Sequence, residues 1–155
     1  MLEPIGLNNF RVYAKNTGFK FVRHNGRELA PGINYNSDLG SIPGVFRWSK
    51  YLTKTGYTPV FVLHDFPFEV LILIAAGKLR KEDYSDGDKF FLSFEENNWI
   101  LLEGLKTLHL VGDSNKMRYK CPPRVALTIY SGVESFVAKN RWNSLLEAAG
   151  FSREL

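Results

Sequence analysis

The spacing of apolar and polar residues changes along the chain, from alternation near the N-terminus to helix-like stripes in the later part. Residues 19–23 (FKFVR) alternate, which is the pattern of a strand with one buried face. Asn25-Gly26 follows, and both residues tolerate the positive φ angles of a two-residue hairpin turn. The pattern predicts a β-hairpin returning over 27–30, with 10–13 as an earlier strand of the same small sheet.

The next segment, Pro31–Gly44, has the composition of a loop throughout, because proline, glycine, asparagine and serine recur along it. Loops of this length are uncommon in compact domains and often carry function. Asp38, Ser41 and Pro43 are its most notable residues. The two polar side chains could contact a site elsewhere in the fold, or could only cap turns through hydrogen bonds to the backbone.

A strongly apolar helix is predicted after this loop. Thr58 is the expected N-cap, and Pro59 fits the first helical position because its missing N–H group has no helical partner there. Pro67 removes a backbone hydrogen bond farther along, so the pattern predicts a kink or an end at this point. A second helical piece is expected over 68–76, with Gly77 as its C-terminal glycine.

The adjacent ionisable residues His64 and Asp65 lie inside this apolar run. Leaving them without partners there would cost several kcal/mol, so polar groups from elsewhere should contact them. The candidates are Asp38 and Ser41 upstream and Asp88 downstream. The expected end of the helix would put the pair in its last turn, where exposed carbonyls favour a protonated or hydrogen-bonded histidine.

Asp88 lies on a predicted helix that begins between 81 and 85 and ends near 97. Tyr84, Asp88, Phe91 and Glu95 share one face of that helix. The aromatic members turn this face inward, which would bring the Asp88 carboxylate toward the core. Alternatively, Asp88 is a surface residue that the helix dipole favours near the N-terminus.

The remaining sequence predicts helices joined by a polar, basic loop. The first covers 99–111, and Cys121-Pro122-Pro123 closes the loop that follows it. A long helix then carries an apolar stripe, and a final helical piece over 140–149 ends at Gly150. The stripe consists of Val125, Ile129, Val133, Phe136 and Val137.

Together these elements predict an α+β fold in a single domain, residues 1–155, with a small N-terminal antiparallel sheet packed on a mostly helical C-terminal two-thirds. A chain of 155 residues that is 45% hydrophobic can bury such a core. The expected core residues are Phe21, Val60, Phe61, Leu63, Phe91, Phe94, Leu101, Ile129, Val133 and Phe136.

The cysteine count and the lengths of the apolar runs bear on the cellular compartment. Cys121 is the single cysteine and excludes an internal disulfide, so nothing requires an oxidising compartment. The first residues lack the pattern of a signal peptide, and the longest apolar run, 70–76, is too short to span a bilayer. We expect a soluble protein made in a cytoplasm, without a transmembrane segment.

Charge and aromatic content bear on partners. The net charge of +4 permits attraction to anions, but lysine and arginine are scattered, so we expect no specific nucleic-acid binding. Aromatic residues make up 14% of the chain, more than a core of this size needs, and such residues are enriched in protein interfaces. We therefore expect contacts with other proteins, including oligomeric assembly.

Several of these features occur in an order that resembles an uncharacterised family of small proteins from tailed bacteriophages and prophages. The family pattern is an Asp-x-x-Ser-x-Pro loop, a hydrophobic helix ending in His-Asp, and an Asp-x-x-Phe helix. Here the loop is DLGSIP (38–43), the pair is His64-Asp65 and the last motif runs from Asp88 to Phe91. The resemblance covers roughly 29–94, and 130–136 corresponds to the family's terminal helix.

The chain departs from this family pattern in three places. Gly44 stands where the family tends to carry arginine, and Phe66-Pro67-Phe68 stands where a tyrosine is favoured after His-Asp. The apolar segment 68–77 is also longer than in the family. If that tyrosine hydroxyl serves chemistry in the family, this chain lacks it.

A second, more distant resemblance is to the secretory calcium-dependent phospholipases, whose helices carry an adjacent His and Asp and, on an antiparallel neighbour, another Asp. It implies that His64 activates water, Asp65 helps to hold calcium and Asp88 orients the imidazole. Calcium needs further oxygen ligands, which Asp38 and the backbone of 38–44 would have to supply. Those enzymes also rely on disulfides that this chain lacks.

Two functional hypotheses follow. The first is a phage-encoded virion component of the tail or head-tail region, found in the virion or in the host cytoplasm during assembly. Its His64, Asp65 and Asp88 would form a buried network that fixes the loop at Ser41 and Pro43. The second is a small hydrolase of lipid esters or cell-envelope bonds, with His64 as general base, Asp88 as its orienting partner and Asp65 or Asp38 as a metal ligand or water-positioning group. A small regulatory or host-interaction protein is the remaining alternative.

Overall fold

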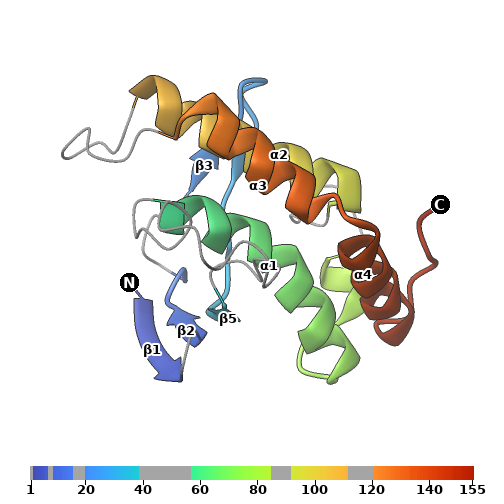
Figure 1. The fold of residues 1–155 in the computed structure, drawn as a ribbon. Coiled ribbons are helices and arrows are strands. Elements are labelled where there is room, and N and C mark those ends of the chain that lie inside the picture. The colour runs from blue at the N-terminus through green and yellow to red at the C-terminus, as the bar shows by residue number, and fades with distance from the viewer. Residues whose placement is uncertain (1, 7–8, 16–19, 39–56, 85–91, 112–120) are drawn as a thin grey trace.

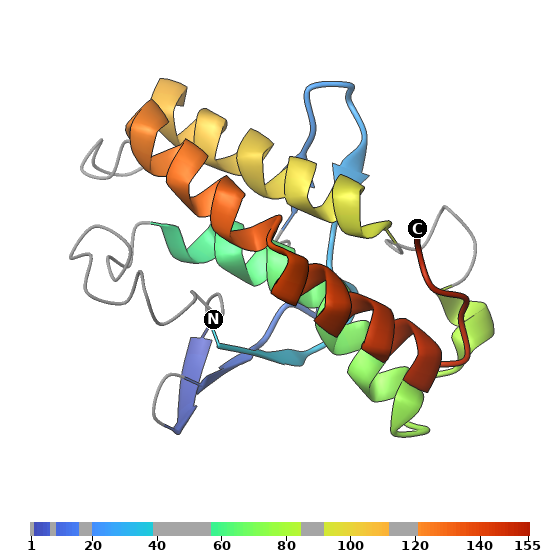
Figure 2. The same cartoon turned by 45° about the vertical axis from the view of Figure 1, so that its right-hand side comes forward.

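The protein has an α+β fold in which small antiparallel sheets precede four α-helices (Figure 1). The computed structural model describes residues 2–6, 9–15, 20–38, 57–84, 92–111 and 121–155. The long central helix, α1 (Thr58–Ala75), packs against strand β5 (Tyr35–Ser37) and against helices α2 (Phe94–Val111) and α4 (Phe136–Ala148), so it lies between β5 and these helices (Figures 1 and 2). The predicted fold class is confirmed.

A three-stranded antiparallel sheet has the order β1-β2-β5. Its strands are β1 (Leu2–Gly6), β2 (Asn9–Val12) and β5 (Tyr35–Ser37). Strand β5 lies in the segment predicted as loop, so that prediction is wrong at 35–37. Its side chains alternate buried, exposed and buried, but the polar middle and last residues hide the alternation from a reading of hydrophobicity.

The predicted hairpin is confirmed as a separate sheet of β3 (Phe21–Val22) and β4 (Glu28–Leu29). Its loop has three residues, not two, because Arg23 N donates to Arg27 O at 2.9 Å. Gly26 takes a φ of 83° there, the left-handed conformation that such loops require. The expectation that β2 shares a sheet with this hairpin is wrong.

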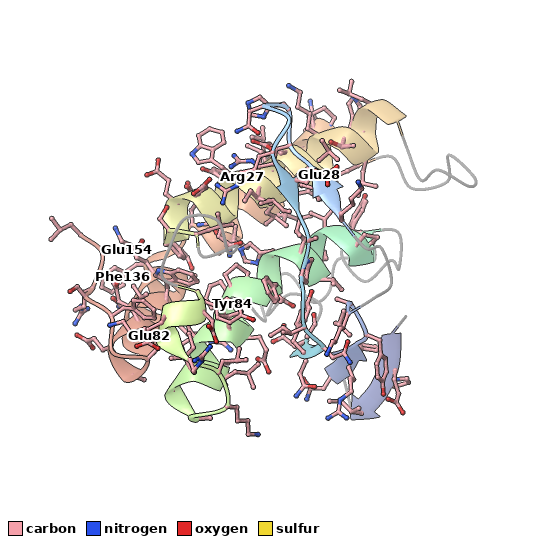
Figure 3. The ribbon with its side chains drawn as sticks, turned by 180° about the vertical axis from the view of Figure 1, so that it is seen from behind. Arg27, Glu28, Glu82, Tyr84, Phe136 and Glu154 are labelled. Atoms are coloured by element: carbon pink, nitrogen blue, oxygen red, sulfur yellow. The ribbon has the colours of Figure 1, made fainter. Side chains whose placement is uncertain are left out.

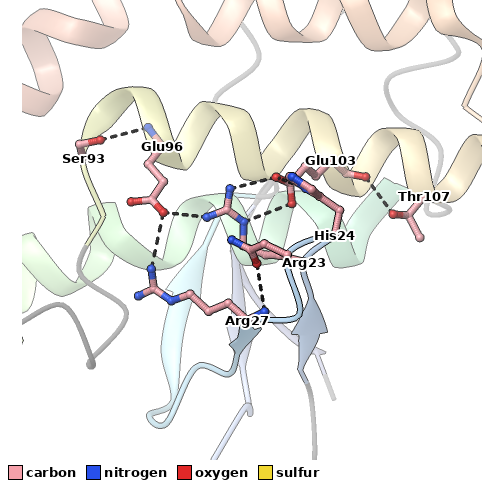
Figure 4. A network of polar contacts seen from close by, with 8 residues as sticks. Arg23, His24, Arg27, Ser93, Glu96, Glu103 and Thr107 are labelled. Atoms are coloured by element: carbon pink, nitrogen blue, oxygen red, sulfur yellow. Dashed lines mark hydrogen bonds and ion pairs between the residues drawn. The ribbon is translucent and has the colours of Figure 1, made fainter.

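Helix α2 (Phe94–Val111) anchors the hairpin through a buried guanidinium (Figure 4). Arg23 donates to Glu103 through Nη2 at 2.9 Å and Nε at 3.2 Å, and to Glu96 through Nη1 at 2.7 Å. The two glutamates lie two turns apart on the same helix face, so one side chain spans both. His24 Nδ1 also lies 2.8 Å from Glu103 Oε1.

Helix α1 (Thr58–Ala75) is one continuous element, so the break predicted at Pro67 is wrong. Its N-cap is Tyr57, one residue before the predicted Thr58. The C-terminal glycine is confirmed: Gly77 has a φ of 70°, and the N–H groups of Gly77 and Lys78 donate back to the last turn of the helix.

The helix predicted from 81–85 to 97 is wrong at two described places, because Lys81–Asp83 is a short 3₁₀ helix and residues 92–93 are irregular. Residues 85–91 lie outside the described part of the chain, and 94–97 are helical as the first turn of α2. Ser93 explains where α2 starts, since its hydroxyl accepts the Glu96 N–H at 3.1 Å. Ser-x-x-Glu is the sequence of a capping box. The helix predicted over 99–111 is confirmed as the later part of α2.

The long helix predicted after Pro123 is divided into α3 (Pro123–Val133) and α4 (Phe136–Ala148). Ser135 starts the second helix, because its hydroxyl accepts the Ala138 N–H at 3.3 Å. The change of direction turns the end of the predicted apolar stripe outward, so Phe136 is 79% exposed and its assignment to the core is wrong. Gly150 ends α4 as predicted, with a φ of 80°.

The C-terminal segment runs back along α4 and reaches the start of α2 (Figure 3). The buried amide of Asn143 donates to Glu154 O at 3.1 Å and accepts the Glu154 N–H at 2.8 Å. The Glu154 carboxylate in turn accepts the Phe94 N–H at 2.9 Å, in the first turn of α2. Three elements are therefore joined at this point.

Most of the predicted core is confirmed. Val60, Phe61, Leu63, Phe94, Leu101 and Ile129 are buried, whereas Phe21 and Val133 are partly buried against the core. Phe91 lies outside the described residues. Gly104 lets α2 approach α1 closely, since a Cβ there would lie 2.9 Å from a methyl group of Val60. Within the described residues, no helix is long and apolar enough to cross a membrane.

Candidate functional site

His64 lies in the middle of α1, not in a last turn as predicted, because the helix continues past Pro67. A proline leaves the carbonyl four residues back without its usual helical donor. Side chains from two other elements donate hydrogen bonds to the carbonyls on either side of that one. The Tyr35 hydroxyl donates to Val62 O at 2.6 Å, and the Asn97 amide donates to His64 O at 3.0 Å.

The His64 imidazole is buried, with 7% of the residue exposed. Its Nε2 lies 3.1 Å from Oδ1 of Asn98, on α2. The amide nitrogen of Asn98 donates to Val133 O at 3.4 Å, so the amide oxygen is the atom that faces the ring. This pairing assigns the proton to Nε2, because a carbonyl oxygen can only accept.

Asp65 joins α1 to the N-terminal sheet. One carboxylate oxygen accepts the Ser37 hydroxyl of β5 at 2.5 Å. The other lies 3.7 Å from His64 Nδ1, which is too long for a hydrogen bond but close enough for a charge on the imidazole to be felt. Burial first, and then the charge of Asp65, raise the pKa of Tyr35.

A group of carboxylates surrounds this point. Burial raises the pKa of Glu69, one turn after Asp65, and the charges of Asp65 and Asp38 raise it further. A backbone hydrogen bond from Asn36 and the charge of Arg141 act in the opposite direction. The three acids therefore share one electrostatic environment between α1 and the end of β5.

The structure describes only part of the predicted site. His64 and Asp65 lie together at the junction of α1 with β5, and the charge of Asp38 acts on Glu69, one turn after Asp65. Asp88 lies outside the described residues, as do Ser41 and Pro43, so their predicted roles stay predictions. Among the residues that the structure describes, no group of three or more His, Cys, Asp or Glu side chains is arranged to hold a metal ion.

The polar partners of His64 and Asp65 differ from those predicted from the sequence. Ser37 lies one residue before the predicted Asp38, within a stretch whose composition is that of a loop. Asn97 and Asn98 are both completely buried. Two adjacent asparagines inside a helix that is otherwise apolar on its inner face are a detectable signal, because buried amides need partners.

The orientation of the imidazole bears on whether His64 could act as a general base. A general base needs one ring nitrogen directed at the group that it deprotonates. In His64, Nε2 carries the proton and faces Asn98, and Nδ1 faces Asp65 inside the fold. Both nitrogens thus face protein groups.

Comparison with known proteins adds no relative to this picture: no family model, no curated protein and no solved structure matches the chain.

Proposed function

We propose that this chain is a non-catalytic assembly component of a tailed-bacteriophage particle, in the tail or head-tail region, in which His64 and Asp65 stabilise the fold. The observation that carries the non-catalytic role is the imidazole geometry, since Nε2 is bonded to Asn98 at 3.1 Å and the ring is buried. The phage setting is supported by the sequence resemblance over 29–94.

Exposed apolar side chains support a role in binding other proteins. Phe136 and Val137 are 79% and 76% exposed on the first turn of α4, and Leu127 and Trp99 are 59% and 47% exposed on α3 and α2. Large exposed apolar side chains that gather on a surface mark sites of protein contact. An assembly component needs such surfaces.

The hydrolase remains the second candidate because Asp65 lies 3.7 Å from His64 Nδ1, and because the charges of Asp65 and Asp38 both act on Glu69. In that reading His64 would have to turn one ring nitrogen toward a lipid ester or a cell-envelope bond. Asp88 would have to orient the ring.

Deleting the gene tests the proposal. Cells producing particles without this chain should yield incomplete particles in negative-stain electron microscopy, with heads and tails that are not joined or not finished. Supplying the wild-type chain or His64→Gln from a plasmid should restore titre, because glutamine keeps an N–H donor for Asn98. Complete particles without the chain would contradict an assembly role. Failure of a folded, normally abundant His64→Gln chain would favour catalysis.

A further inference from the structure

Apolar side chains lie next to one another on the outer faces of α2 and α3. The two helices lie side by side and antiparallel (Figure 2). Trp99 of α2 and Tyr130 of α3 meet there, with ring centroids 5.7 Å apart. Leu127, 59% exposed, lies one turn from Tyr130, and the partly buried Leu102 lies one turn from Trp99.

Acidic side chains lie at one end of this surface. Glu95 is one turn before Trp99, and Glu134 is one turn after Tyr130 and accepts its hydroxyl at 2.5 Å. Burial, the hydrogen bond and charge of Glu134, and the charge of Glu95 raise the pKa of Tyr130 to about 12. Both carboxylates are therefore close to the aromatic pair.

Basic side chains lie at the opposite end. Lys106 is exposed about two turns after Trp99 on α2, and Arg124 is exposed about two turns before Tyr130 on α3. At 1.5 Å per residue, Glu95 and Lys106 are separated by about 16 Å along α2, and Arg124 and Glu134 by about 15 Å along α3. The acid-to-base separation is thus nearly the same on both helices.

We propose that this surface docks a second copy of the same chain through a two-fold axis across the apolar centre. The rotation exchanges the two ends, so Glu95 of one copy meets Lys106 of the other, and Glu134 meets Arg124. Isologous interfaces require this self-complementarity, in which each contact occurs twice. The Trp99, Leu102, Leu127 and Tyr130 side chains of both copies would form the dry centre.

The division of charge also selects against other occupants. A uniformly anionic partner, such as nucleic acid or an acidic membrane, would be attracted by Lys106 and Arg124 but repelled by Glu95 and Glu134. A second copy satisfies both ends at once. This inference rests on the proposed assembly role and deepens it by naming one partner. Dimerisation is measured with the purified chain in solution, so its result does not depend on whether particle assembly fails.

Charge reversal gives the sharpest test. The wild-type chain should show a concentration-dependent dimer in sedimentation velocity, while Glu95→Lys and Lys106→Glu should each raise the dissociation constant about tenfold or more. Mixing these two variants should restore the dimer, because in the mixed dimer every Glu faces a Lys at these positions. Glu82→Lys, on the 3₁₀ segment away from α2 and α3 (Figure 3), carries the same charge change and should dimerise like the wild type.

Circular dichroism of each variant establishes that it is folded. A wild-type chain that stays monomeric at about 100 μM would overturn the proposal, because a specific interface should form a dimer at that concentration. Dimerisation of the single variants at wild-type strength would also overturn it, as would a mixture that stays monomeric.

Discussion

His64 is bonded at Nε2 to a neutral amide, and this partner decides what the side chain can contribute. The Asn98 oxygen accepts the ring N–H in a buried setting, where a hydrogen bond is strong and an unpaired acceptor is costly. The same amide donates to the backbone of α3 at Val133. His64 therefore links α1 to α2 and, through Asn98, to α3.

Replacement of His64 by alanine should destabilise the fold. The change removes a buried ring and leaves the Asn98 oxygen unpaired, so the free energy of unfolding should fall by about 2–4 kcal/mol in urea denaturation. His64→Gln should lose less, because its amide can still donate to Asn98. Phe136→Ala is the matched control, since it also removes a ring, but from a side chain that is 79% exposed. Equal stability of His64→Ala and the wild type would show that the residue has no structural role.

The sequence predicts that His64 and Asp65 need polar partners, but it does not predict which residues those partners are. An ionisable pair in an apolar helix must be satisfied, and both His64 and Asp65 are. The partners come from β5 and α2, which approach α1 only in the folded state. Neither the burial of Ser37 nor the direction of the Asn98 amide can be read from local sequence.

At the scale of elements, the position of the β3-β4 hairpin depends on a few charged side chains. The strands of the hairpin are two residues each, so their own hydrogen bonds provide little. The Arg23 guanidinium supplies the link to α2, with 9% of its side chain exposed. Charge-assisted hydrogen bonds of this kind are stronger than neutral ones.

The contribution of the Arg23–Glu103 ion pair to the free energy of unfolding should depend on pH. Burial raises the pKa of Glu103, but the hydrogen bonds and charges of Arg23 and His24 bring it below the ordinary value of 4.5. The folded state thus favours the charged form, and the stabilisation is present above that value and lost as the pH falls through the lower folded pKa. Glu103→Gln should cost about 1–3 kcal/mol near pH 7, and this difference should shrink in acid.

Thermal unfolding of wild type and Glu103→Gln between about pH 3 and pH 7 measures this effect. Glu28→Gln is the control, because its ion pair with Lys20 leaves both side chains more than half exposed and should contribute little. A wild-type-to-Glu103→Gln difference that stays constant across the range would contradict the assignment.

Helix ends show which elements local sequence can predict. Gly77 and Gly150 were identifiable because a left-handed residue after a helix is nearly always glycine. The Ser93-x-x-Glu96 capping box is also present in the sequence, but it lies inside the helix predicted from 81–85 to 97, so the start of α2 was missed. The continuation of α1 through Pro67 was not predictable, because donors from Tyr35 and Asn97 support the weakened turn. Tertiary contacts override the local preference there.

At the scale of the whole molecule, α1 is the element on which the others converge. Strand β5 and helices α2 and α4 all pack on it, and the polar contacts of His64 and Asp65 lie among those interfaces. The α+β class followed from the order of alternating and helical segments. The sheet order β1-β2-β5 did not, because strand pairing depends on contacts between residues distant in sequence.

The surface of the molecule carries the features through which it would act. The α2-α3 face offers an apolar centre with opposite charges at its ends, and the first turn of α4 exposes Phe136 and Val137. Exposed apolar side chains of this kind suit a component that contacts its own copies or another protein.

The most direct test of the proposed assembly role is the composition of purified particles. Particles produced by the genome that encodes this chain should be purified through a density gradient, washed in high salt and quantified by mass spectrometry. The account predicts the chain at a fixed ratio to the major particle proteins across the gradient peak. Its presence only in the soluble fraction, with complete and infectious particles that lack it, would contradict the account.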